Sequence, residues 1–335
     1  MKKFLHFALL TLISALTTEI SRGQDVQFSQ YYASPVFLNP AFAATPNNTR
    51  LGLQYRDQWR AIGNNFRSGL FHGAHLFERA NSGLGLIAHK SLEGSGRYSV
   101  TEFALVYAYR IKVGKKSFLI PAIQAGMSGR SIDFSNLDFP DQYTNNGMSQ
   151  GTSENLSGGR KNFADFSAGI LYYNKRVFAG FSSHHLSQPN QALISGNDPL
   201  PRKYSGHAGY KIFLSDPESD REQSFILTAN YKFQGKADQL DAGAYFILNP
   251  ITFGLWYRGL PMKTFAEFRN NESVVGMIGL HMKHLRIGYS YDYVISALRG
   301  YSGAVHEISL NLEFYIKKPK AKNLIEKYGL PIPMF

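Results

Sequence analysis

Apolar and polar residues alternate along many segments of this chain. In 285–293 the odd positions are Leu, Ile or Tyr, whereas the even positions are Arg, Gly, Ser and Asp. The same period of two occurs in 101–109, 225–233, 251–257 and 308–316. Because successive side chains of a strand point to opposite faces, each segment is a predicted β-strand with one apolar face.

Fourteen segments of this kind follow one another along the chain. Tight turns such as Asn174-Lys175 and Asn249-Pro250 separate some of them, whereas 131–162 and 185–202 are long polar connections. The predicted strands lie near 50–58, 66–79, 83–90, 97–111, 117–130, 163–174, 176–184, 203–214, 223–234, 239–248, 250–258, 272–282, 284–293 and 304–316.

The apolar faces of these strands need a partner, which is either a second sheet or lipid. Many segments approach the roughly 9–11 residues that a tilted membrane strand requires. Tyrosines and phenylalanines gather near segment ends, where a barrel carries its aromatic girdles. Charged residues such as Glu102 and Asp292 share the opposite face, which a barrel turns inward. We therefore predict an all-β, transmembrane antiparallel outer-membrane β-barrel of about 14 strands; a soluble sandwich is the alternative.

The first residues have the composition of an export signal. Lys2 and Lys3 precede an apolar run, Phe4 to Leu16, that is too short for a permanent membrane helix. We expect a signal peptide at 1–23, an N-terminal segment at 24–46, the barrel at 47–316 and a basic tail at 317–335. An even strand count predicts that both ends of the mature chain are periplasmic.

Composition narrows the function further. The 335 residues include 31 glycines but no cysteine, which excludes disulfides, zinc ribbons, iron–sulfur sites and a thiol nucleophile. The formal net charge is +12. Export makes nucleic acid an improbable partner for this basic chain, whereas a membrane surface or an acidic protein fits it.

Several motifs along the mature chain resemble one family in their order. The chain opens with QDVQFSQYY from Gln24, continues with LNPA from Leu38 and YRDQW from Tyr55, and later has HHLSQPN from His184. It departs from the family at Ala43-Ala44-Thr45, where a glycine is usual, and after Ile316. The positions that carry the resemblance include Phe28, Ser29, Gln30, Tyr31, Asn39, Pro40, His184, His185, Gln188, Pro189, Asn190, Tyr301, His306 and Glu307.

These motifs are similar to those of the PorP/SprF family of outer-membrane proteins, which are associated with the type IX secretion system and with gliding motility. The resemblance implies a barrel that supports export or surface attachment of cargo proteins or gliding adhesins by docking partners. Implied partners are outer-membrane lipid, the secretion machinery or a secreted surface adhesin, and periplasmic or peptidoglycan-associated proteins. No catalytic residue carries over. A diffusion porin for small solutes is the alternative function.

Two histidine clusters invite chemistry but lack the required arrangement. Ser182-Ser183-His184-His185 has the residue types of a hydrolase, yet a catalytic triad is a three-dimensional arrangement rather than an adjacent run. We expect these histidines to bond with the loop 188–190. His281 and His284 have no third ligand nearby. No metal and no cofactor are predicted.

Two segments lie outside the predicted strands. The segment 25–46 is too apolar for a free tail, so we hypothesise that it plugs the barrel lumen. The tail is basic and then apolar, and we hypothesise that it docks a periplasmic or cell-wall-bound partner, with a disordered end as the alternative. Its candidate contact residues are Lys317, Lys318, Lys320, Lys322, Tyr328 and Phe335.

Overall fold

A computed structural model describes most of the chain after the predicted signal peptide. The predicted signal peptide at 1–23 and the six candidate tail residues between Lys317 and Phe335 lie outside the described residues. The described ranges are 25–45, 49–62, 66–94, 97–144, 147–148, 151–153, 159–194, 196–215, 223–265, 268–297, 299–314 and 331–332.

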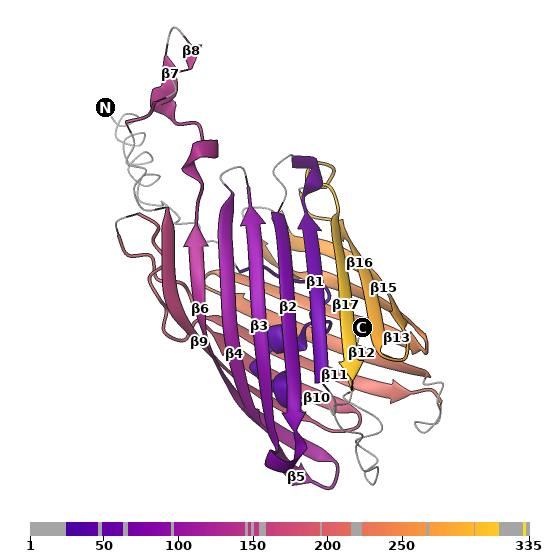
Figure 1. Cartoon of the computed structure of the whole chain (residues 1–335). Coiled ribbons are helices and arrows are strands. Elements are labelled where there is room, and N and C mark those ends of the chain that lie inside the picture. The colour runs from indigo at the N-terminus through magenta and orange to yellow at the C-terminus, as the bar shows by residue number, and fades with distance from the viewer. Residues whose placement is uncertain are drawn as a thin grey trace, which may run out of the picture.

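The strands close into one antiparallel ring of fourteen. Figure 1 shows the first and last strands side by side, and they pair from Thr49 with Phe314 to Gln58 with Val305. The ring runs in chain order through β1 (Thr49–Gln58), β2 (Phe66–Phe77), β3 (Ser82–Glu93), β4 (Tyr98–Tyr109), β6 (Ser117–Ser131), β9 (Arg160–Tyr173), β10 (Val177–His184), β11 (Lys203–Phe213), β12 (Gln223–Gln234), β13 (Ala237–Leu248), β14 (Ile251–Phe265), β15 (Phe268–His281), β16 (Leu285–Val294) and β17 (Val305–Phe314).

Three short strands lie outside this order. β5 (Ile111–Gly114) follows β4 beyond Arg110 and pairs with the start of β6. β7 (Tyr143–Thr144) and β8 (Gly147–Met148) pair with each other in the connection between β6 and β9. The predicted barrel of about 14 strands is confirmed.

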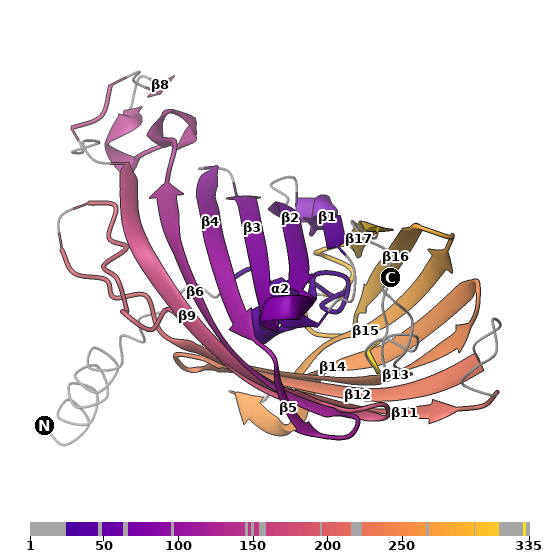
Figure 2. The same cartoon turned by 60° about the horizontal axis from the view of Figure 1, so that its bottom comes forward.

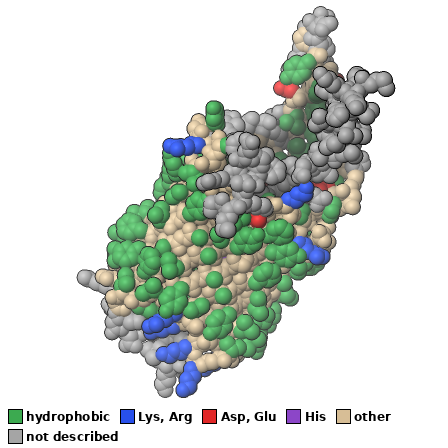
Figure 3. All heavy atoms as spheres, turned by 180° about the vertical axis from the view of Figure 1, so that it is seen from behind, with side chains coloured by type: hydrophobic (Ala, Val, Ile, Leu, Met, Phe, Trp, Pro, Cys, Tyr) green, Lys and Arg blue, Asp and Glu red, His purple; other side chains and the backbone are tan. Residues whose placement is uncertain are grey.

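Side chains alternate between the two surfaces of the barrel wall. In β4, Phe103, Leu105 and Tyr107 are exposed, whereas Ala104 and Val106 between them are buried. Figure 3 shows hydrophobic side chains across one outer face, with Lys and Arg sparse in its middle. An apolar exterior of this kind fits a strand surface that faces lipid, and closure leaves no sheet edge to satisfy there.

The connections differ between the two rims of the barrel. Since the strands alternate in direction, the long connections after β6 and β10 lie at one rim. The short turns after β9, β13 and β15 lie at the other rim, where β17 also ends. We call these the long-loop rim and the short-turn rim.

The interior of the barrel is occupied by the N-terminal segment, residues 25–45. It contains α2 (Pro35–Leu38) and a 3-10 helix (Pro40–Ala44), and Figure 2 shows α2 inside the ring of strands. Most of its side chains are buried, including Phe28, Tyr32 and Phe42. Among the described residues, no helix is long and apolar enough to cross a membrane.

Candidate functional site

The N-terminal segment is shaped by two prolines and one asparagine. Pro35 and Pro40 occupy first-turn positions, where the missing N–H of proline costs nothing. The Asn39 side chain caps the 3-10 helix by accepting from the Ala41 N–H at 2.9 Å. Its amide also donates to the backbone carbonyls of Ile170 at 3.1 Å and Phe181 at 3.2 Å. Asn39 thus ends α2 through its backbone N–H, which donates to the Pro35 carbonyl, while its side chain starts the next turn and joins it to β9 and β10.

A buried carboxylate on β17 holds the start of the segment. The two oxygens of Glu307 accept the backbone N–H groups of Ser29 at 2.8 Å and Gln30 at 2.7 Å. Ser29 Oγ donates to Asp292 on β16 at 2.6 Å. Arg56 on β1 donates to Ser29 Oγ at 2.7 Å and pairs with Glu307 at 3.0 Å. Charge-assisted bonds of this type are stronger than neutral ones, so the segment is fixed to three strands at this point.

A second ion-pair cluster continues the first along the inner surface of the barrel. Arg258 on β14 pairs with Asp241 on β13 at 2.7 Å and with Asp292 at 3.2 Å. Lys232 on β12 also pairs with Asp241, at 2.7 Å. Together with Arg56 and Glu307, these groups bring three positive and three negative side chains into the lumen. The balance matters because an unpaired charge in this buried position costs several kcal/mol.

Apolar and aromatic contacts complete the attachment of the segment. Tyr32 packs edge-on against Phe178 with ring centroids 5.5 Å apart, and Phe42 stacks on His207 at 5.4 Å. Ala41 to Ala44 are each at most 1% exposed and pack in the same apolar cluster. The small side chains of 43–44, where the resembled family usually has glycine, therefore fit against the barrel wall.

Gly83 on β3 provides a test of this close contact. A Cβ at Gly83 would lie 2.5 Å from the backbone of Ala43 and Ala44. We expect Gly83→Val to destabilise the protein by about 1–3 kcal/mol, the usual cost of overpacking. Gly69→Val is the control, because a Cβ at Gly69 meets no atom within 4 Å. Urea unfolding of both variants checks this, and equal stabilities would contradict the contact.

Asp25, the first residue that the structure describes, belongs to a polar cluster near the long-loop rim. His185, directly after β10, lies 2.7 Å from Asp25 through Nε2 and 2.7 Å from Asp165 through Nδ1. Lys203 at the start of β11 lies 3.0 Å from Asp25. The Asp25 backbone N–H also bonds to the side chain of Gln234, the last residue of β12, at 3.0 Å.

Asp25 lies toward the long-loop rim, whereas β17 ends at the short-turn rim. Residues 25–45 therefore run through the lumen from one rim toward the other. That both ends of the mature chain are periplasmic stays a prediction.

Burial alone would lower the pKa of His185, but the carboxylates of Asp25 and Asp165 outweigh it and raise this pKa to about 10. Burial alone would raise the pKa of Asp25, yet His185 and Lys203 hold it well below its usual range. At neutral pH, His185 is therefore a cation between two carboxylates.

The protonated His185 predicts a loss of stability in alkali. A raised pKa stabilises the fold fully below the unfolded value of about 6.5, and this contribution decreases as pH rises to about 10. The lowered pKa of Asp25 has the opposite pH dependence: its contribution to stability is present at neutral pH and is lost only in strong acid. Melting curves between pH 6 and 10.5 should therefore fall more steeply for the native chain than for His185→Gln. Parallel curves would contradict the cluster.

The histidine run contacts both the N-terminal segment and the loop 188–190. Ser182 Oγ donates to the Leu38 carbonyl of the N-terminal segment at 2.9 Å, and His184 Nε2 donates to the same oxygen at 3.4 Å. The predicted bond to the loop 188–190 is made by the backbone, because the His185 carbonyl accepts from the Gln188 N–H at 3.0 Å. The side chain of His185 lies between Asp25 and Asp165. In that loop, Asn190 accepts from Ala192 and Asp198 N–H groups.

The remaining motif positions have local structural partners. Gln188 adopts φ +46°, and the Pro189 carbonyl accepts from the Leu200 N–H at 2.9 Å. Tyr301 is 78% exposed in the connection before β17. His306 bonds to the hydroxyl of Tyr289 at 2.8 Å. These residues shape the long-loop rim and the wall beside it.

Some residues of the site were not singled out by sequence reasoning. Arg56, Asp241, Arg258 and Asp292 form the lumen clusters. Arg56 lies in the YRDQW motif, whereas the signal for Asp241, Arg258 and Asp292 was a charge on the inward face of a strand. In the tail, Ile332 is 2% exposed and belongs to the apolar cluster that also contains the N-terminal segment. Among the residues that the structure describes, no group of three or more His, Cys, Asp or Glu is placed to hold a metal.

These features define a class: a closed outer-membrane β-barrel whose lumen is occupied by its own N-terminal segment. The family model described as type IX secretion system membrane protein PorP/SprF matches residues 20–312. The chain belongs to this family. A search of curated proteins finds no match.

Several solved structures are similar at low identity. The toluene transporter TodX of P. putida is 10% identical with a TM-score of 0.44, over 87% of this chain and 95% of that chain. A FadL homologue of Pseudomonas aeruginosa is 15% identical with a TM-score of 0.42, over 84% and 94%. CdiB from Acinetobacter baumannii is 8% identical with a TM-score of 0.43, over 80% of this chain, which spans 60% of CdiB. The barrel fold of this protein is shown by its own strand pairing and not by these similarities.

Proposed function

We propose that this protein is a non-enzymatic docking component of the type IX secretion system. In this role it supports the export or surface attachment of cargo proteins or gliding adhesins, and it does not conduct solutes. The observation that carries the proposal is the occupied lumen: Glu307, Asp292 and Asn39 tie the N-terminal segment to the wall by buried hydrogen bonds. A channel would need this space for water and ions.

Docking surfaces then remain at the two rims. The long-loop rim carries exposed residues such as Tyr143 and Tyr301, which suit contacts with a secreted protein outside the cell. The tail follows β17 at the short-turn rim, and we propose that this rim is periplasmic. Its lysines, Lys317, Lys318, Lys320 and Lys322, with Tyr328 and Phe335, are proposed to contact periplasmic or peptidoglycan-associated proteins.

The test is affinity purification of an epitope-tagged chain from mildly solubilised outer membranes, followed by mass spectrometry. Docking predicts recovery of a secreted surface adhesin or of secretion-machinery proteins. A second strain that lacks 317–335 should lose the periplasmic partners and keep the cell-surface ones. Recovery of the chain alone, together with a measurable conductance, would contradict docking and favour the diffusion porin.

A further inference from the structure

A cavity of about 630 Å³ lies between the N-terminal segment and the barrel wall. Its sides are the inward faces of β3, β4, β6 and β9, and part of the β10–β11 connection covers it. Tyr98, at the start of β4, and Asp198, in that connection, place it on the side of the long-loop rim. The volume is in the range of small-molecule sites, which measure about 300–1,000 Å³.

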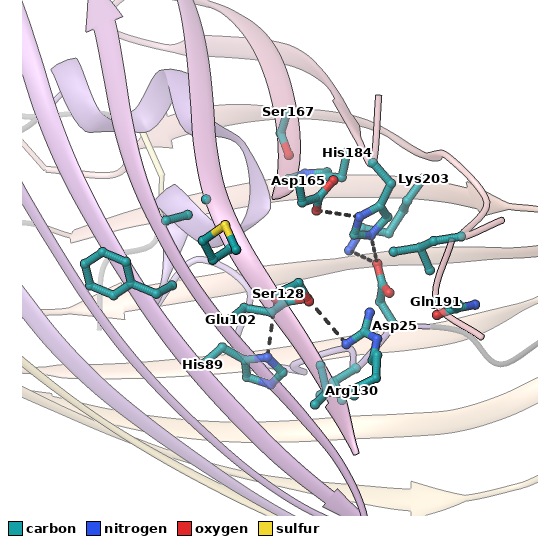
Figure 4. A pocket seen from close by; sticks show the side chains of 18 of the residues that line it. Asp25, His89, Glu102, Ser128, Arg130, Asp165, Ser167, His184, Gln191 and Lys203 are labelled. Atoms are coloured by element: carbon teal, nitrogen blue, oxygen red, sulfur yellow. Dashed lines mark hydrogen bonds and ion pairs between the residues drawn. The ribbon is translucent and has the colours of Figure 1, made fainter. Parts of the chain in front are cut away.

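Several buried polar groups border this cavity without a hydrogen bond. Arg130 and Ser128 on β6 are each 3% exposed, and Ser167 on β9 is 2% exposed. Arg130 Nε and Nη1, both serine hydroxyls and Gln124 Oε1 have no hydrogen-bond partner. Buried polar atoms in native proteins are almost always bonded to protein, to ordered water or to a ligand, so this group is able to bind a polar ligand. Figure 4 shows Arg130, Ser128 and Ser167 around the same space.

The unsatisfied set contains both donors and acceptors. Arginine only donates, an amide oxygen only accepts, and a hydroxyl does either. A ligand that bonds to all of these groups must therefore carry several hydrogen-bond donors and several acceptors. An apolar ligand would leave these groups unpaired, at a cost of about 1–3 kcal/mol each.

Charge argues against an anionic ligand. Glu102 already lies 3.7 Å from Arg130 Nη1 and 3.5 Å from His89 Nδ1. Five carboxylates line the cavity against three cations, which are Arg130, Lys203 and the protonated His185. The carboxylates belong to Asp25, Glu93, Glu102, Asp165 and Asp198. A second anion beside Arg130 would meet net repulsion.

A peptide is also a poor match. Extended peptides gain much of their affinity from free main-chain groups at a sheet edge. The cavity is walled by strand faces, and β3, β4 and β6 are each paired with a neighbour on both sides. The wall therefore offers side chains rather than main-chain partners.

We propose that this cavity binds a small neutral saccharide from the side of the long-loop rim. Sugar hydroxyls both donate and accept, and they carry no charge. Arg130, Ser128, Ser167 and Gln124 bind these hydroxyls, while the Phe37 ring provides an apolar wall. This site is independent of partner docking, because its ligand contacts the interior and not the rims.

The experiment is calorimetric titration of the full-length protein in nanodiscs. The probes are glucose, galactose, mannose, N-acetylglucosamine and their β1,4- and α1,4-linked dimers and trimers. We expect saturable one-to-one binding for at least one of them, with glucuronate weaker than glucose. Arg130→Gln should weaken that binding by at least about tenfold, since a hydrogen bond to a charged group contributes about 1.5–3 kcal/mol.

Two further variants separate binding from folding. Ser128→Ala removes one hydroxyl and should weaken binding without a change in the heat-dependent gel mobility of the barrel. Arg160→Gln alters an exposed arginine on the neighbouring strand and should bind like the native chain. No binding by any probe, or equal binding by Arg130→Gln and the native chain, would each overturn the proposal.

Discussion

Deletion of Asp25–Thr45 should convert a closed barrel into a conducting one. In planar bilayers we expect discrete conductance steps from the deletion variant and none from the native chain. The reason is geometric. Side chains alone fill the interior of an eight-stranded barrel, whereas porins of sixteen to eighteen strands enclose an open aqueous channel. A barrel of fourteen strands lies between these two sizes. The segment occupies the interior, so its removal leaves a water-accessible lumen lined by charged side chains.

A milder variant serves as the control for this deletion. Glu307→Gln keeps the segment and the size of the side chain, but removes the charge that holds the Ser29 and Gln30 N–H groups. We expect occasional openings from this variant, fewer than from the deletion. Steps of porin size from the native chain, or a silent deletion variant that inserts normally, would contradict the occupied lumen.

Replacement of Arg258 by methionine should cost about 3–5 kcal/mol of unfolding free energy. This is the usual result when one partner of a buried ion pair is removed and its counter-charges remain. Arg258 is 0% exposed and compensates both Asp241 and Asp292. Lys232 still pairs with Asp241 at 2.7 Å and Arg56 with Asp292 at 3.3 Å, so each carboxylate keeps one cation but the cluster loses its charge balance.

Urea unfolding followed by tryptophan emission measures this effect. Trp256 is 2% exposed and lies 6.3 Å from Tyr31 between ring centroids, so it reports on the filled lumen. Arg176→Met, at an exposed turn after β9, is the matched control and should change stability by less than about 0.5 kcal/mol. The account is contradicted if Arg258→Met and Arg176→Met unfold alike.

The strands were predictable because their signal is local. A wall that has lipid outside and polar groups inside imposes a period of two on each segment, and all fourteen predicted segments correspond to strands. The largest error in length concerns β14, predicted to end at 258 and observed to end at Phe265. Register shifts after Arg258 and after Leu260 interrupt the alternation there, so the pattern alone could not follow the strand further.

The contents of the lumen were only partly predictable. The apolar residues of 25–46 indicated that the segment is not free, but several of its partners lie more than 200 positions away in the sequence. Ser29 and Asp292, for example, meet only because the barrel closes. A charge on an inward strand face, as in Asp292 or Glu307, shows that a partner is needed without showing which one. The short helices at 35–38 and 40–44 had no periodic signal at all.

The central claim is that the N-terminal segment lies inside the closed barrel. A cysteine cross-link tests this claim most directly. A Cβ at Gly85 on β3 would lie 3.2 Å from the Ala43 Cβ, near the separation of a disulfide, and the chain has no native cysteine. In intact outer membranes, we expect Ala43→Cys/Gly85→Cys to form an intramolecular disulfide under mild oxidation. Ala43→Cys/Gly69→Cys should keep both thiols. Free thiols in the first pair, with the cysteine at position 43 open to a bulky maleimide, would place the segment outside the lumen and contradict the account.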